Sequence, residues 1–480
     1  MTSALSADVL RWPVIGAFLR WRHARTSLQL VLLLVAVVVI LHGFLGPQVA
    51  PANLATVLSW VHYRGLLVVA LLAAGNFFCT GCPFVRVRDV GRRGRAPSFG
   101  WPRWLRTKWI GIALFVGVLF AYELFDLWAL PRATAWLVLG YFIVALSIDL
   151  VFTGATFCKY LCPIGQFSFV ASTLSPLELQ VRQPETCRTC RTVDCIKGRR
   201  DPVAPHRTVQ RGCELALFLP TKVGNMDCTF CLDCVQACPH DNIALAARVP
   251  GLELVDSRRR SGIGRLSRRP DIAALVVVFV FGGLLNAFGM VAPVRALEPW
   301  LASALGTSSD TIVLGTMFVV ALGIAPLALL GGATLLTAVL TGGTPSSWGR
   351  TAAGYVYALV PLGFGVWLSH YGFHLLTGAL TVVPVTQSAA IDLVGWPVLG
   401  VPLWPWTGMQ PGSVFPVQLG LILLGAMGSL GLAYLISERD YSEQPVRATI
   451  PWAVVTLVLT AAAIWILSQP MEPRGMGFAG

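Results

Sequence analysis

Apolar stretches long enough to cross a lipid bilayer recur along most of this chain. The hydrocarbon core of a bilayer is about 30 Å thick, so a helix that crosses it needs about 20 mainly apolar residues. Because lipid offers no hydrogen-bond partner to the backbone, such stretches fold as helices. We predict about nine membrane-spanning helices, in the ranges 28–45, 57–78, 108–128, 134–152, 271–291, 311–336, 352–375, 414–436 and 450–468.

The composition and the N-terminus fit this prediction. Of the 480 residues, 55% are hydrophobic and only 12% are charged, and the mean hydropathy is +0.69. These values lie outside the range of soluble globular proteins. The first 27 residues are basic and lack a small-residue cleavage site, so we expect the range 28–45 to stay as an anchor.

The basic residues orient the predicted spans. If the spans alternate in direction, most Lys and Arg residues lie in loops on the same side of the membrane. The positive-inside rule assigns that side to the cytoplasm, here of a bacterial inner membrane. The net charge of +13 then reflects topology, and we expect no nucleic-acid partner. We interpret the arginines in 86–95 as contacts to lipid head groups. The basic residues at or beyond the outer half are Arg64, Arg132, Arg295 and Arg474.

A dense cysteine motif lies in the long loop after the fourth predicted span. Cys228, Cys231, Cys234 and Cys238 have the spacing C-x2-C-x2-C-x3-C-P. In this spacing three thiolates bind one [4Fe–4S] cluster, and the fourth cysteine binds a second cluster. A zinc site would instead show two separated C-x2-C pairs. The motif therefore predicts iron–sulfur clusters.

A second, looser cysteine set lies upstream, with the spacing C-x2-C-x4-C and a further cysteine at Cys213. The crossed rule for two-cluster proteins assigns the ligands to two groups. They are Cys187, Cys190, Cys195 and Cys238 (group one), and Cys228, Cys231, Cys234 and Cys213 (group two). Alternatively, Cys213 is an ordinary buried thiol and the second cluster is incomplete.

The remaining cysteines form an internal repeat. The second and fourth spans each end in a cysteine pair followed by proline, Cys79/Cys82 and Cys158/Cys162. If two helical hairpins are related by an axis along the membrane normal, the four thiols (group three) converge. They would hold a third cluster or another thiophilic metal. Alternatively, each pair is a redox-active dithiol or has a structural role. Cysteines confined to such motifs indicate metal ligands in a reducing compartment.

Together, these motifs resemble the membrane polyferredoxins of the NapH, CcoG and NosR type, which are [4Fe–4S]-binding membrane proteins. The resemblance covers about residues 30–270 and rests on the paired Cys-Pro motifs followed by the two-cluster segment. It implies electron transfer between a quinol pool or cytoplasmic donor and a partner redox protein, within a larger complex. The sequence departs from that pattern because it lacks a sizeable periplasmic domain and continues with further spans.

The predicted fold is an all-α polytopic membrane helix bundle with an inserted cytoplasmic, ferredoxin-like α+β domain for two clusters. We expect a basic cytoplasmic N-terminus, a four-helix membrane region with the repeated motifs, the ferredoxin-like domain, a five-helix membrane region and a periplasmic tail. Their limits are 1–27, 28–152, 153–270, 271–468 and 469–480.

Four histidines map to the outer third of the predicted membrane region: His42, His62, His370 and His374. Two of them, His370 and His374, share one helix face and can present imidazoles to a haem, a copper ion or a quinone. Arg64 is costly in lipid, and intramembrane ionisable groups are often functional. Alternatively, the histidines are hydrogen-bonded to neighbouring helices and the arginine reaches water.

Two acidic residues near the ends of spans have simpler interpretations. Asp149 is expected to be a packed, hydrogen-bonded acid, with proton relay as the alternative. Glu123 lies at the outer end of its predicted span and is expected to be solvated there.

The sequence thus predicts a membrane-bound iron–sulfur electron carrier or oxidoreductase subunit that links a cytoplasmic or quinol donor to a membrane or periplasmic redox partner. The alternative is a maturation factor, a metal reductase that serves the metal centre of a respiratory enzyme. Redox-driven transport is a third alternative, which receives little support because the last five predicted spans hold few charged residues.

Overall fold

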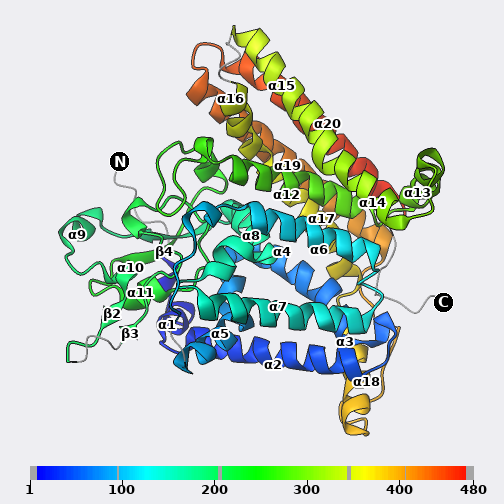
Figure 1. Ribbon diagram of the computed structural model, residues 1–480, viewed down its shortest axis with the longest axis horizontal. Coiled ribbons are helices and arrows are strands. Elements are labelled where there is room, and N and C mark those ends of the chain that lie inside the picture. The colour runs from blue at the N-terminus through cyan, green and yellow to red at the C-terminus, as the bar shows by residue number, and fades with distance from the viewer. Residues whose placement is uncertain (1–7, 95–96, 204–207, 343–347, 406, 472–480) are drawn as a thin grey trace. The chain divides into compact units, whose positions relative to one another are not determined.

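The computed structural model describes residues 8–94, 97–203, 208–342, 348–405 and 407–471, and the chain divides into two compact units (Figure 1). The first unit comprises Met1–Val35, Ala70–Gly111 and Tyr141–Arg269, and the second comprises Ala36–Val69, Ile112–Gly140 and Pro270–Gly480. The domain limits predicted from the sequence remain predictions, and the predicted tail lies outside the described residues from 472 onward.

Among the described residues, eight helical runs have the length and composition to cross a membrane. They are Ala24–Leu45, Leu54–Ala74, Pro131–Val151, Pro270–Phe288, Asp310–Thr341, Trp348–Thr377, Pro411–Asp440 and Pro445–Ser468. The prediction of a multi-pass, mainly helical membrane protein is confirmed. The predicted span 108–128 forms a shorter apolar helix, α6 (Trp109–Leu124, 16 residues).

The second unit is built around four long helices that lie side by side (Figure 1). These are α12 (Pro270–Phe288), α17 (Val360–Thr377), α19 (Pro411–Asp440) and α20 (Pro445–Ser468). Small residues allow close packing between membrane helices: a Cβ atom at Gly425 of α19 would lie 2.7 Å from the carbonyl oxygen of Pro361. The indole of Trp367 in α17 donates to the Phe279 carbonyl of α12 at 2.7 Å.

The other helices of the second unit are shorter, and two of its spans contain π-helical segments, Val57–Tyr63 and Val320–Ile324. Such segments place extra residues in a turn and are frequent at functional sites. The shorter helices are α3 (Leu54–Thr56), α13 (Ala292–Leu305), α14 (Asp310–Val319), α15 (Ala325–Thr341), α16 (Trp348–Tyr355) and α18 (Val382–Val394).

Among the described residues, four strands form two antiparallel pairs, and all of them lie in the first unit. Strand β1 (Leu177–Val181) pairs with β4 (Ile243–Ala247), with Leu179 opposite Leu245. The short strands β2 (Arg199–Arg200) and β3 (Thr208–Gln210) form the second pair. Since β1 precedes and β4 follows the cysteine-rich segment, their pairing brings the two ends of that segment together.

Three short helices lie in the described part of the cysteine-rich segment, which is otherwise mainly loop, and Figure 1 shows them near β4. They are α9 (Pro184–Thr189), α10 (Asp194–Lys197) and α11 (Asp233–Ala237). The remaining helices of the chain are α1 (Ile15–Arg20), α2 (Ala24–Leu45), α4 (Arg64–Ala74), α5 (Pro83–Gly94), α7 (Pro131–Val151) and α8 (Pro163–Ala171). A small sheet region beside helices agrees with the predicted α+β insert, whose identity as a ferredoxin domain remains a proposal.

Candidate metal centre

The group-two cysteines lie on a tightly wound loop. Asp227, Phe230 and Leu232 adopt left-handed backbone conformations, with φ of 63°, 51° and 61°, which few residues other than glycine adopt. Phe230 is fully buried in the core of the first unit. The loop turns repeatedly between its cysteines, and Cys234 follows the first residue of α11.

An acidic residue stands next to three of the four group-two cysteines, and each is bound by a basic residue from outside the loop. The most buried pair is Lys108–Asp227, with 2.6 Å between Nζ and Oδ1 and both side chains 2% exposed. Burial lowers the pKa of Lys108, and Asp227 opposes that shift. A buried pair is costly to break, because removing one partner leaves an uncompensated charge.

The other two acids are bound in the same way. Arg25 contacts Asp233, which precedes Cys234, at 2.6 Å. Arg88 of α5 contacts Glu214, which follows Cys213, also at 2.6 Å. These three ion pairs fasten both chain segments of group two to the helices that lead toward the predicted membrane spans.

Hydrogen bonds connect the group-two loop directly to the first cysteine pair. The 3₁₀ turn Asn76–Gly81 carries Cys79. In this turn, the Asn76 amide donates to the Cys228 carbonyl at 3.0 Å and the Thr80 hydroxyl donates to the Phe230 carbonyl at 2.6 Å. Groups two and three are therefore adjacent within the first unit.

The four group-three thiols are neighbours in a buried region. Burial, and then the nearby Cys82 and Cys162 thiols, raise the pKa of Cys79 well above its usual range. The pKa of Cys158 is also raised well above its usual range, first by burial and then by Asp149, Cys82 and Cys162. Cys158 lies in the π-helical turn Phe157–Leu161.

The group-one cysteines lie on a similar but more open element. Helix α10 begins with Asp194 and Cys195 after the left-handed Val193, as α11 begins with Asp233 and Cys234 after Leu232. Burial raises the pKa of Cys195 to about 11, and Cys238, Cys187 and Cys190 add to that shift.

Two observations concern the crossed assignment of Cys238 and Cys213, which stays a prediction. Asn242 links Cys238 to Cys187, because its backbone N–H donates to the Cys238 sulfur at 3.5 Å and its amide to the Cys187 sulfur at 3.3 Å. Cys213 lies close enough to Cys228, Cys231 and Cys234 to raise the pKa of each thiol, in addition to burial.

Each group consists of thiols, which are the ligands of iron–sulfur clusters. Within the described ranges, no group of three or more His, Cys, Asp or Glu side chains that could hold a metal ion is found. The iron–sulfur assignment therefore stays a proposal. Hydrogen bonds to sulfur tune such clusters, and the backbone N–H groups of Leu217 and Gly165 donate to the sulfurs of Cys213 and Cys162.

The head-group interpretation of the arginines in 86–95 is wrong for two of them. Arg88 is 1% exposed and contacts Asp149 at 3.5 Å as well as Glu214. Arg92 donates to the backbone carbonyls of Asp149 and Gly154. Asp149 is a packed acid, as expected, since its carboxylate also accepts from the Phe157 N–H at 2.9 Å.

Two of the four predicted outer histidines have polar contacts at both ring nitrogens. In His42, Nδ1 accepts from the Leu54 N–H at 3.1 Å and Nε2 lies 3.3 Å from the Asp392 carboxylate. In His62, the ring nitrogens lie 3.1 and 3.3 Å from the carbonyls of Val57 and Ala379. These contacts match the structural alternative for both residues.

His370 and His374 lie in α17, both buried, with ring centroids 5.2 Å apart and planes nearly perpendicular at 89°. Tyr371 between them packs under Arg64, whose guanidinium lies 4.7 Å from the tyrosine ring centroid. The same guanidinium donates to the Tyr122 hydroxyl at 3.2 Å. Arg64 is thus held by aromatic rings within the second unit and does not extend to water.

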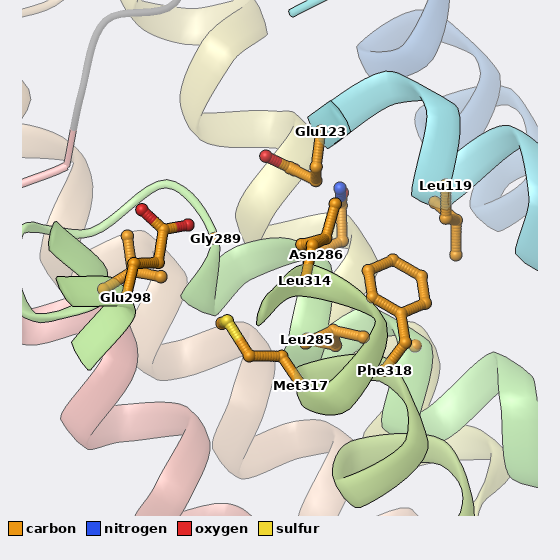
Figure 2. A pocket seen from close by; sticks show the side chains of 11 residues that line it. Leu119, Glu123, Leu285, Asn286, Gly289, Glu298, Leu314, Met317 and Phe318 are labelled. Atoms are coloured by element: carbon orange, nitrogen blue, oxygen red, sulfur yellow. The ribbon is translucent and has the colours of Figure 1, made fainter. Parts of the chain in front are cut away.

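A small pocket lies in the second unit (Figure 2). Its polar lining comes from Glu123 of α6, Asn286 of α12 and Glu298 of α13, and leucine, methionine and phenylalanine side chains line the rest. Figure 2 shows the Asn286 amide directed toward Glu123. Asn286 is 4% exposed, and its Oδ1 has no hydrogen-bond partner among the described residues. The expectation that Glu123 is simply solvated is wrong.

Sequence reasoning missed Lys108, Arg25 and Arg88 as partners of group two. A usable signal was present, because an acidic residue stands directly beside three of its cysteines, in Glu214, Asp227 and Asp233. An acid beside a buried ligand loop needs a basic partner. The pattern does not say which basic residue supplies it.

Comparisons with known proteins give one partial match. The chain is 30% identical over 97 residues to "Putative electron transport protein YccM" of Escherichia coli (strain K12). The match covers 20% of this chain and 23% of that protein, so the chain spans about a quarter of the curated relative's length. No protein-family model matches the chain, and no solved structure matches it.

Proposed function

We propose that this multi-pass membrane protein transfers electrons through [4Fe–4S] clusters held by groups one and two. The observation that carries the proposal is the arrangement of twelve cysteines in three neighbourhoods of four. The partial likeness to a protein named for electron transport supports the general role. The cysteines would ligate iron, and the clusters would accept and donate single electrons.

The order of the groups supports a relay. Group one is the most open, group two is buried, and hydrogen bonds from Asn76 and Thr80 join group two to group three. A third cluster in group three would extend the relay toward the predicted membrane region. In this proposal the clusters face the cytoplasm of an inner membrane and link a cytoplasmic or quinol donor to a membrane or periplasmic redox partner.

Paired cysteine variants test this function. Dithionite should bleach the visible absorbance of the anaerobically purified protein and produce electron paramagnetic resonance signals of reduced clusters. Cys187→Ser with Cys190→Ser should remove one signal, and Cys228→Ser with Cys231→Ser another. A wild-type protein that dithionite does not bleach would contradict the proposal.

Metal reduction is a second candidate function. Group three lies directly beside group two and is composed of thiols, which suit a thiophilic metal. In that case group two would reduce a metal ion held by Cys79, Cys82, Cys158 and Cys162, for delivery to another enzyme. Cys79→Ser with Cys82→Ser would then abolish a metal centre in that enzyme while the group-one and group-two clusters are still reduced.

A further inference from the structure

The segment around the group-one cysteines is strongly basic and exposed. From Pro184 to Arg200 the sequence contains five basic residues and two acidic ones. Arg188 is neutralised in part by Glu185, at 2.9 Å. Four others form the basic patch: Arg191, Lys197, Arg199 and Arg200, all exposed.

The charges of the basic patch are not neutralised by any ion pair in the part of the chain that the structure describes. Among the described residues, none of these four side chains forms an ion pair. This contrasts with the basic residues around group two, where Arg25, Arg88 and Lys108 each bind a carboxylate. Four unpaired cations on a short segment produce a positive field that an anionic partner would experience.

The patch coincides with the most accessible cysteines. Cys187, Cys190 and Cys195 are partly exposed, whereas Cys228 and Cys234 are 8% and 7% exposed. Arg191 directly follows Cys190, and Arg199 begins β2 four residues after Cys195. A redox protein that docks on the patch would therefore bring its own centre close to group one.

We propose that the basic patch is the docking surface for a soluble, acidic electron-transfer protein that exchanges electrons with the group-one cluster. The proposal deepens the proposed function and rests on it. Electron-transfer partners form small, weak interfaces, and complementary charge steers their encounter more than it raises affinity. Unpaired, exposed arginines suit such an encounter because they keep their field and remain mobile.

The test compares two matched charge reversals in the full-length protein. The first is R191E with R199E and R200E. The control, R259E with R265E and R268E, changes three exposed arginines outside the patch by the same charge. The probe is a reduced, acidic plant-type ferredoxin, and the readout is the second-order rate of cluster reduction at low and high salt. Iron content and circular dichroism verify that both variants are folded and loaded.

For the wild type and the control variant, the rate should be high at low salt and fall about tenfold or more as salt screens the charges. The patch variant should be about tenfold slower or more at low salt, with little salt dependence. Dithionite should bleach all three proteins equally. Calorimetry with oxidised ferredoxin should show weaker binding only for the patch variant.

Three results would overturn the proposal. If the patch variant is reduced by ferredoxin at the wild-type rate and with the wild-type salt dependence, the patch does not take part in electron transfer. If the patch variant no longer binds vesicles of anionic lipid but is reduced by ferredoxin at the wild-type rate, the patch binds the membrane surface instead. If dithionite fails to bleach the wild type, the electron-transfer function itself is wrong and the docking surface is rejected with it.

Discussion

Groups one and two use the same local element in opposite surroundings. Each places an Asp-Cys pair at the start of a short helix after a left-handed residue, Asp194–Cys195 in α10 and Asp233–Cys234 in α11. Around group two the acids are paired with buried cations and the cysteines are enclosed. Around group one the four cations of the basic patch are exposed and form no ion pair among the described residues. This difference is the basis for proposing group two as an inner relay and group one as the exchange point with soluble partners.

The largest expected effect distinguishes a buried ion pair from an exposed one. Lys108→Met leaves Asp227 without its partner, and we expect a loss of about 3–5 kcal/mol in unfolding free energy. The control, Arg188→Met, breaks a pair whose side chains are 74% and 75% exposed, and should cost less than about 1 kcal/mol. Chemical denaturation in detergent measures both. Equal losses would show that the Lys108–Asp227 contact does not fasten the group-two loop.

The next effect concerns oxidation of the loaded protein. Because susceptibility to oxidants follows exposure, air should release iron from group one on the order of five times faster than from group two. Brief alkylation followed by mass spectrometry should therefore label Cys187 and Cys190 before Cys228 and Cys234. If the group-one and group-two cysteines were labelled at the same time, the proposed difference in exposure between the two groups would be wrong.

The smallest effect is on reduction potentials. Arg25 contacts Asp233 at 2.6 Å in the enclosed group-two loop, and its positive charge stabilises the reduced, more negative cluster. Arg25→Met should lower the group-two potential on the order of 50 mV, as a unit charge at roughly 10–15 Å in an effective dielectric of about 20 implies. Arg191→Met should change the group-one potential far less, because solvent screens its charge. A redox titration followed by electron paramagnetic resonance separates the two.

The helical membrane architecture could be predicted from the sequence, because the apolar runs alone require it. Eight predicted ranges coincide with helices long and apolar enough to cross a membrane, while the range 108–128 becomes the shorter α6. The helix is shorter mainly at its C-terminal end, because α6 stops at Leu124 and Asp126 adopts a left-handed backbone conformation with φ of 42°. Hydropathy cannot detect such a boundary.

Spacing predicts which cysteines form each group, and that grouping stays a prediction, whereas the sequence does not show which residues surround the groups. Arg88 appears in the sequence as one of several arginines beside a membrane span, yet it is buried against Asp149 and Glu214. Glu123 appears as a solvated residue at a helix end, yet it lines a pocket with Asn286. Both depend on segments far apart in the sequence, which local patterns do not place together.

The most direct test of the iron–sulfur assignment is the iron and acid-labile sulfide content of protein purified without oxygen. Clusters in groups one and two predict about eight atoms of each per chain, and a further cluster in group three raises both numbers to about twelve. Colourless protein without sulfide, or protein carrying zinc in place of iron, would contradict the assignment.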